Sequence, residues 1–144
     1  MKIIIPGRLA GANEYILKCR TDRVGAASFK AKQEQIVQAA VLDCLHHKPT
    51  PFEKPVVLHY LWVEPGMQRD KDNIAFAHKF IQDAFVKIGL LAGDGWRYVA
   101  GFTDDFAVDK ANPRIEVTIE EVEGECLVPK RKRSSSRGAK RRGK

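Results

Sequence analysis

Two aspartates separated by a single residue, Asp70 and Asp72, lie among basic residues in the stretch RDKDN. In an extended segment this spacing puts both carboxylates on the same side of the chain. A third carboxylate, Asp94, follows in the turn GDG, and a strand that starts near it can pass beside the strand preceding Asp70. Carboxylate oxygens are the ligands that Mg²⁺ prefers, together with waters and substrate phosphate oxygens. The three aspartates therefore predict a magnesium site.

Each aspartate also has an ordinary structural explanation. Asp72 or Asn73 could cap the helix that follows, because Asp and Asn are favoured N-cap residues. Asp94 precedes Gly95 and suits a turn. A D-x-D pair is also found in sugar-nucleotide transferases, although a chain of 144 residues without a recognisable nucleotide-diphosphate fold argues against that class. The local pattern alone leaves these alternatives open.

Lys79 is the candidate for stabilising negative charge. It lies seven residues after Asp72, close to two helical turns, and should project from the same face of a helix. That face lies off the apolar stripe, so the ammonium group can lean toward a phosphate. The alternative is an i,i+4 ion pair with Asp83, worth about 0.3–0.5 kcal/mol. We expect His78 at the surface rather than as a base.

The apolar pattern predicts the elements that must position these side chains. Strands are expected at residues 2–6, 56–63, 96–102 and 113–121, and helices at about 27–47 and 74–88. Residues 7–26 are rich in Gly, Arg and Asn and suggest an irregular connection. The order β-α-β-α-β-β predicts an α+β fold with one small mixed sheet of about four strands and two main helices.

Apolar side chains mark the core face of each expected element. The strand at 56–63 is apolar almost throughout, which is typical of a strand buried on both faces. The strand at 113–121 alternates, so one of its faces should be solvated. The first helix has a stripe of Phe29, Ile36, Val37, Ala40, Val41 and Cys44. The second helix has a stripe of Ala77, Phe80, Ile81, Ala84, Phe85 and Ile88, and Gly89 should end it.

The net charge of +7 is concentrated at the C-terminal end. Residues 129–144 hold nine of the 25 Lys and Arg residues and no acid, so the remaining chain is slightly acidic. We expect one folded domain over 1–128 and a disordered basic tail over 129–144. A flexible polycation gains affinity for nucleic acid by releasing counterions, and the alternative is a solubilising terminus.

The cellular setting follows from composition. No run reaches the roughly 20 apolar residues of a membrane span, so no membrane is expected among the partners. The three cysteines are far apart and form no C-x-x-C pair, which suggests reduced thiols and neither a disulfide framework nor a zinc site. These features predict a soluble cytoplasmic protein.

The sequence resembles the RusA-type Holliday junction resolvases, small endonucleases often carried by phages and prophages. The resemblance spans roughly residues 2–122. It is carried by RDKDN at 69–73, KFIQDAF at 79–85, GLLAGDGW at 89–96 and PRIEVTIEE at 113–121, while PGRLAGANEYI at 6–16 is similar to one branch of the family. It implies a Mg²⁺-dependent homodimer, with Mn²⁺ as a substitute metal, that cuts two opposed strands of a four-way DNA junction in recombination and repair.

The resemblance also implies roles for individual residues. The family's three metal-binding aspartates fall on Asp70, Asp72 and Asp94, its functional lysine on Lys79, and its basic residue before the first aspartate on Arg69. Three more residues separate the lysine from the second aspartate than in some members. Only one carboxylate stands at the third site, where the family often has two.

Further DNA contacts are expected from basic residues away from the metal, because DNA is a polyanion. The candidates are Arg20, Arg23, Lys30, Lys32 and Arg69, each of which could instead be a solvated surface charge. The rival function is a nucleic-acid-binding protein without catalysis, in which the tail binds and the aspartates only cap and turn.

Overall fold

The computed structural model describes residues 1–123. Its elements are β1 (Lys2–Pro6), α1 (Ala12–Thr21), α2 (Arg23–Leu45), β2 (Val56–Glu64), α3 (Lys71–Ala75), α4 (His78–Ile88), β3 (Val99–Val108) and β4 (Arg114–Glu121). The predicted basic tail at 129–144 and the domain boundary at residue 128 lie outside the described residues. Within residues 1–123, no helix has both the length and the apolar composition needed to cross a membrane.

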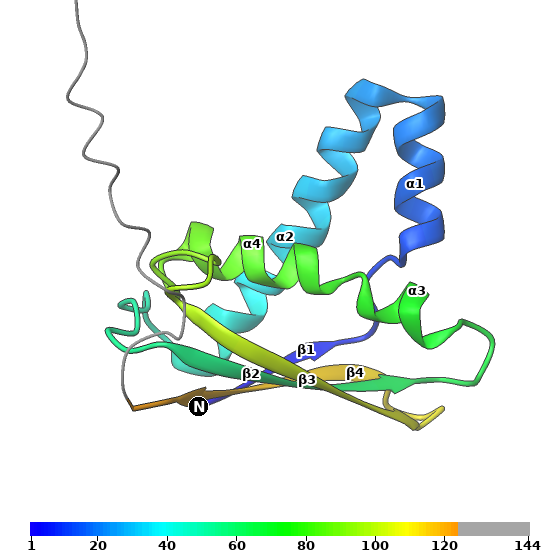
Figure 1. Cartoon of the computed structure of the whole chain (residues 1–144). Helices are drawn as coiled ribbons and strands as arrows, with labels where there is room; N and C mark the ends of the chain where they lie inside the picture. The colour runs from blue at the N-terminus through cyan, green and yellow to red at the C-terminus, as the bar shows by residue number, and fades with distance from the viewer. Residues whose placement is uncertain (124–144) are drawn as a thin grey trace, which may run out of the picture.

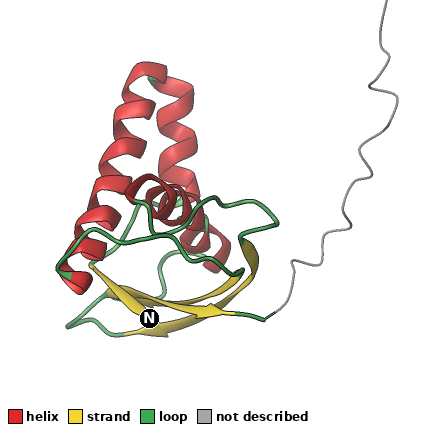
Figure 2. Ribbon diagram, turned by 90° about the vertical axis from the view of Figure 1, so that its left-hand side faces the viewer, coloured by secondary structure: helices red, strands yellow, loops and turns green. Residues whose placement is uncertain are grey.

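The four strands form one mixed sheet in the order β1-β4-β2-β3. Strand β4 runs antiparallel to both β1 and β2, whereas β3 runs parallel to β2. Figures 1 and 2 show the helices on one face of this sheet. The predicted α+β class with a small mixed sheet is confirmed.

The central strand β2 is buried differently from its prediction. Its helix-facing side chains are at most 1% exposed, namely those of Val56, Leu58, Tyr60 and Trp62. The side chains that alternate with them, Val57, His59 and Leu61, are half-buried. The prediction of burial on both faces is therefore wrong, because within residues 1–123 the other face of the sheet has no helix against it. Strand β4 alternates as expected, with Ile115, Val117 and Ile119 buried.

Helix α4 packs on the sheet through the predicted stripe. All six stripe residues are buried, five of them within α4 and Ala77 immediately before it. Gly89 ends the helix in the left-handed conformation, with φ of 86°, and its N–H bonds to the carbonyls of Phe85 and Val86. A residue with a side chain would be strained there, which explains the glycine.

The segment expected to be irregular at 7–26 is instead mostly helical. Helix α1 has no buried residue, and its apolar residues Tyr15, Ile16 and Leu17 are consecutive in sequence, so they do not form the spaced stripe that identifies a helix. It is stabilised by Glu14, which accepts from the Gly11 N–H at 3.2 Å, and by packing against α2. Helix α2 begins at Arg23, earlier than predicted, because the Asp22 carboxylate accepts from the Gly25 N–H.

Helices α1 and α2 form a hairpin that rises away from the sheet (Figure 1). Its core face matches the predicted stripe in part: Val37, Ala40 and Val41 are buried, but Ile36 is 40% exposed and Cys44 is also exposed. Glu34 is buried in their place and pairs with Lys30 and Lys87. Together with the pair between Lys30 and Asp83, these contacts join α2 to α4.

Candidate functional site

A groove of about 580 Å³ opens where β2 and β3 end. It is lined by Glu64, Gly66, Met67, Arg69, Asp70, Lys71, Asp72, Ile74, Phe106, Ala107 and Val108. The structure thus brings together the first two of the three predicted aspartates. It adds a lysine between them and an apolar wall from the end of β3.

The two aspartates reach the groove through the start of α3 rather than through an extended segment. Asp70 is the N-cap, and its backbone carbonyl accepts from the Ile74 N–H at 3.1 Å, but its side chain makes no capping bond. Asp72 lies in the first turn, where one carboxylate oxygen accepts from the Asn73 N–H at 2.9 Å. Within residues 1–123 the Asp70 carboxylate has no hydrogen bond or ion pair, so it is available to an external cation.

Arg69 and Glu64 anchor the segment that carries the aspartates. Arg69 donates to both oxygens of Glu64, at 3.1 and 2.8 Å, and to the Leu9 carbonyl at 3.1 Å. Arg8 donates to Glu64 as well, at 3.0 Å. Burial opposes ionisation of Glu64, but the two guanidinium groups outweigh it and hold the pKa of this carboxyl below its usual value. Arg69, predicted as a DNA contact, is therefore committed to these internal bonds.

Lys71 supplies a positive charge inside the groove. Its side chain lies over the Phe106 ring, with the ammonium nitrogen 5.5 Å from the ring centre. The residue is exposed, so the charge remains accessible from solvent. An ammonium beside two carboxylates suits the binding of a phosphate held against a cation.

Lys79 does not line this groove. The i→i−3 hydrogen bonds at Ala77 and Lys79 separate α3 from α4, so the phase of one helix does not continue into the other. Lys79 lies 3.4 Å from Asp83, one turn further along α4. The alternative role of Lys79, an ion pair with Asp83, is thus present. Lys30 of α2 also binds Asp83, at 2.7 Å, so this pair lies on the side of α4 that faces α2.

Asp94 lies at the opposite end of the sheet from Asp70. Strand β3 begins at Val99 and runs parallel to β2, so Val99 pairs with Val56 at the start of that strand. Strand β2 spans nine residues at about 3.3 Å each, which puts its two ends on the order of 25 Å apart. The expected convergence of three aspartates is not met within one chain, because the helical crossover returns the chain to the starting edge. Within residues 1–123 no group of three or more His, Cys, Asp or Glu residues is placed to hold a metal.

Comparison with known proteins adds no assignment to this geometry. No family model matches the chain, and no curated protein matches it significantly. The likeness to RusA-type resolvases therefore stays a prediction that rests on the motifs.

The other predicted DNA contacts divide into free and committed residues. Arg20, in the last turn of α1, and Arg23, at the start of α2, are exposed beside the turn that forms the tip of the hairpin. Lys32 is exposed further along α2. Lys30 is held between Asp83 and Glu34, and the hydrogen bond to Asp83 is the main reason that its pKa is raised. Arg20, Arg23 and Lys32 thus remain accessible to a ligand, whereas Lys30 does not.

His78 was expected at the surface, but it is mostly buried between α4 and β3. Its side chain is 18% exposed, and Nε2 lies 2.6 Å from the Asp104 carboxylate. The Trp62 indole N–H donates to the same oxygen at 2.7 Å. The pair holds the start of α4 against the sheet. The sequence carries no signal for the contact between His78 and Asp104, because it is the register of β3 against β2 that turns Asp104 toward the helices.

Proposed function

We propose that this chain is a Mg²⁺-dependent endodeoxyribonuclease that cuts branched DNA, including four-way junctions, in recombination or repair. The observation that carries the proposal is the Asp70 carboxylate, which has no partner within residues 1–123 and lies in a groove that also holds Asp72 and Lys71. The order of motifs along the chain supports the same class. Asp70 caps α3 without using its side chain, which argues against a purely structural aspartate pair.

The groove offers what a hard cation and a phosphate need. Mg²⁺ is usually bound by one or two carboxylates, several waters and substrate phosphate oxygens, so Asp70 and Asp72 suffice as protein ligands. When bound, the ion would supply Lewis acidity and a more acidic bound water. Lys71 takes the charge-stabilising role first predicted for Lys79, because it lies in the groove and can contact a phosphate oxygen directly.

Arg69 and Glu64 act on the site indirectly in this proposal. Their bonds hold the chain between the end of β2 and the start of α3, and that chain sets the direction of both aspartates. Preorganisation of this kind is needed because misplacing a ligand by about 1 Å can cost roughly 100-fold in rate.

A homodimer in the cytoplasm completes the proposal. Two copies would provide two grooves, one for each opposed strand of a junction. Cys19 and Cys44 are free and exposed, which suits a reducing compartment.

The test is cleavage of a labelled synthetic four-way junction by the full chain, with Mg²⁺ or Mn²⁺ and with EDTA. We expect metal-dependent nicking that Asp70→Asn and Asp72→Asn each reduce by about 100-fold or more, while junction binding persists. Asp105→Asn is the matched control, because Asp105 is exposed on the sheet face away from the helices.

Two results would reject the proposal. One is the absence of cleavage with any divalent metal, and the other is wild-type cleavage by Asp70→Asn. Asp94→Asn separates two arrangements of the site. Retained cleavage means that the site lies within one chain, and lost cleavage means that a partner supplies Asp94.

A further inference from the structure

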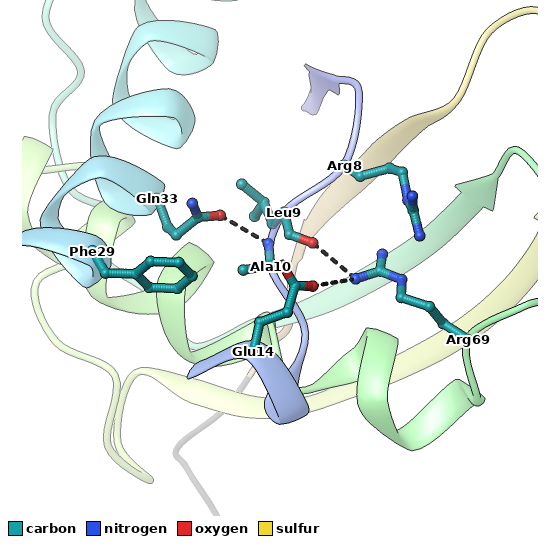
Figure 3. Close-up of a pocket in the computed structure, with 7 residues that line it drawn as sticks. All are labelled: Arg8, Leu9, Ala10, Glu14, Phe29, Gln33 and Arg69. Carbon is teal, nitrogen blue, oxygen red and sulfur yellow. Dashed lines mark hydrogen bonds and ion pairs between the residues drawn. The ribbon is translucent and has the colours of Figure 1, made fainter. Parts of the chain in front are cut away.

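A second pocket, of about 240 Å³, lies beside the groove and shares Arg69 with it (Figure 3). It lies between the loop that follows β1, the start of α1 and the middle of α2. The side chains of Arg8, Glu14, Phe29 and Gln33 line it. None of these residues belongs to the proposed catalytic groove.

Two of these side chains present free hydrogen-bond donors. Arg8 is 39% exposed, and only Nη2 is used, in its bond to Glu64. Its other nitrogens have no partner within residues 1–123. The Gln33 carbonyl oxygen accepts from the Ala10 N–H at 2.8 Å, which leaves the amide NH₂ group without a partner in the described part of the chain.

Glu14 presents the free acceptor. One of its carboxylate oxygens accepts from the Gly11 N–H and lies 3.6 Å from the Arg69 guanidinium. The second oxygen has no hydrogen bond within residues 1–123, and the side chain is 57% exposed. Donors and an acceptor therefore line the same small space.

This charge balance disfavours a bare phosphate as the ligand. The positive charge of Arg69 is already matched by the buried carboxylate of Glu64. The carboxylate of Glu14 would repel an anion bound to Arg8. A neutral ligand that carries donors next to acceptors satisfies the same set of groups without repulsion.

The Phe29 ring adds a flat apolar wall. It packs against Tyr15, with ring centres 6.2 Å apart and planes 28° from parallel, which holds it in place. A planar heterocycle can lie against such a ring while its edge forms hydrogen bonds, as single-stranded nucleic acid bases do on aromatic side chains.

We propose that this pocket binds a guanine base that is turned out of a DNA strand whose phosphate occupies the neighbouring groove. Guanine is the one DNA base with two adjacent donors, N1–H and N2–H₂, and the second oxygen of Glu14, which has no partner within residues 1–123, can accept from the N2 amino group. Its O6 and N7 atoms are acceptors that arginine commonly binds, here Arg8. The inference rests on the proposed function, since the groove must hold DNA.

The proposed contacts require the base to be unpaired, because cytosine occupies the N1–H and N2–H₂ donors of guanine in a duplex. A space of about 240 Å³ has room for one such base. Bases at a branch point are easier to unstack than bases within a duplex, because part of the stacking is already lost. The pocket would thus give the enzyme selectivity for branched DNA next to a guanine.

The experiment measures binding alone, by fluorescence anisotropy of the full chain with junctions in EDTA. The probes carry one unpaired base at the branch point, either guanine, hypoxanthine or adenine. Hypoxanthine lacks only the N2 amino group. We expect wild type to bind the guanine probe about tenfold more tightly than the hypoxanthine probe, as for one hydrogen bond to a charged group.

Glu14→Gln should reduce that preference to less than twofold. The glutamine carbonyl can still accept from Gly11 N–H, so α1 keeps its start. Glu53→Gln, in an exposed loop, is the matched control and should keep the full preference.

Three outcomes would overturn the proposal. They are equal binding of the three probes, no binding of any probe, and an Arg8→Ala variant that weakens all three equally with a shallower salt dependence. That last result would assign Arg8 to a phosphate. Because binding is measured without metal, a protein that prefers guanine but never cuts would reject the nuclease proposal alone. A protein that cuts junctions but binds the three probes equally would reject the guanine-binding proposal alone.

Discussion

Replacing Arg69 with alanine should destabilise the fold more than it affects DNA contact. The Arg69 side chain is 14% exposed and that of Glu64 is 8% exposed, so both charges are largely removed from water. Three hydrogen bonds hold the guanidinium, two to Glu64 and one to the Leu9 carbonyl. Removing it leaves a buried carboxylate with Arg8 as its remaining partner.

The expected cost is about 3 kcal/mol. Breaking a buried ion pair by removing one partner typically costs about 3–5 kcal/mol. The lower end applies because Arg8 still donates to Glu64. With a urea m-value of about 1.5–2 kcal/mol/M, the unfolding midpoint should fall by about 1.5–2 M.

Urea unfolding followed by circular dichroism measures this shift. Arg69→Lys should recover less than half of the loss, because an ammonium group cannot bind both carboxylate oxygens as the planar guanidinium does. In a double-mutant cycle with Glu64→Gln, the two changes should couple by more than about 1 kcal/mol. A loss below about 0.5 kcal/mol, combined with weaker junction binding, would show that Arg69 is a DNA contact and that the internal bonds are dispensable.

The remaining predictions concern charge, pH and the core. Lys71→Ala should reduce single-turnover cleavage by about 100-fold, whereas Lys79→Ala should change it less than threefold; the reverse order would return the catalytic role to Lys79. Glu64 has a lowered pKa in the fold, so its stabilising contribution is complete above about pH 5 and is lost as pH falls through the folded pKa. Glu64→Gln should therefore flatten the decline in unfolding free energy below pH 5, and an unchanged slope in an acid titration would contradict this. Phe85→Ala should cost about 3–5 kcal/mol in urea unfolding, because Phe85 is fully buried, and a cost below about 1 kcal/mol would show that the core around α4 refills the space.

The sequence by itself determined those helices and strands that local periodicity identifies. The stripe from Ala77 to Ile88 predicts α4 and its buried face, and Gly89 predicts its end, because both depend only on neighbours within a few residues. The alternation in β4 likewise depends on a single strand. The sequence also places Asp70 and Asp72 beside the start of a helix. It suggests Asp72 or Asn73 as the N-cap, whereas Asp70 takes that position in the structure.

Only the tertiary structure decided which distant residues meet. Asp94 is separated from Asp70 because β3 lies parallel to β2, and strand direction is set by packing of the whole sheet rather than by residues near Asp94. Lys79 turns toward α2 because the tight turn between α3 and α4 changes the helical phase ahead of Lys79. Helix α1 has no fully buried residue, so its helicity depends on contacts such as those of Tyr15 with Phe29 of α2 and Phe80 of α4. Contacts of this kind join residues tens of positions apart, and no local pattern specifies them.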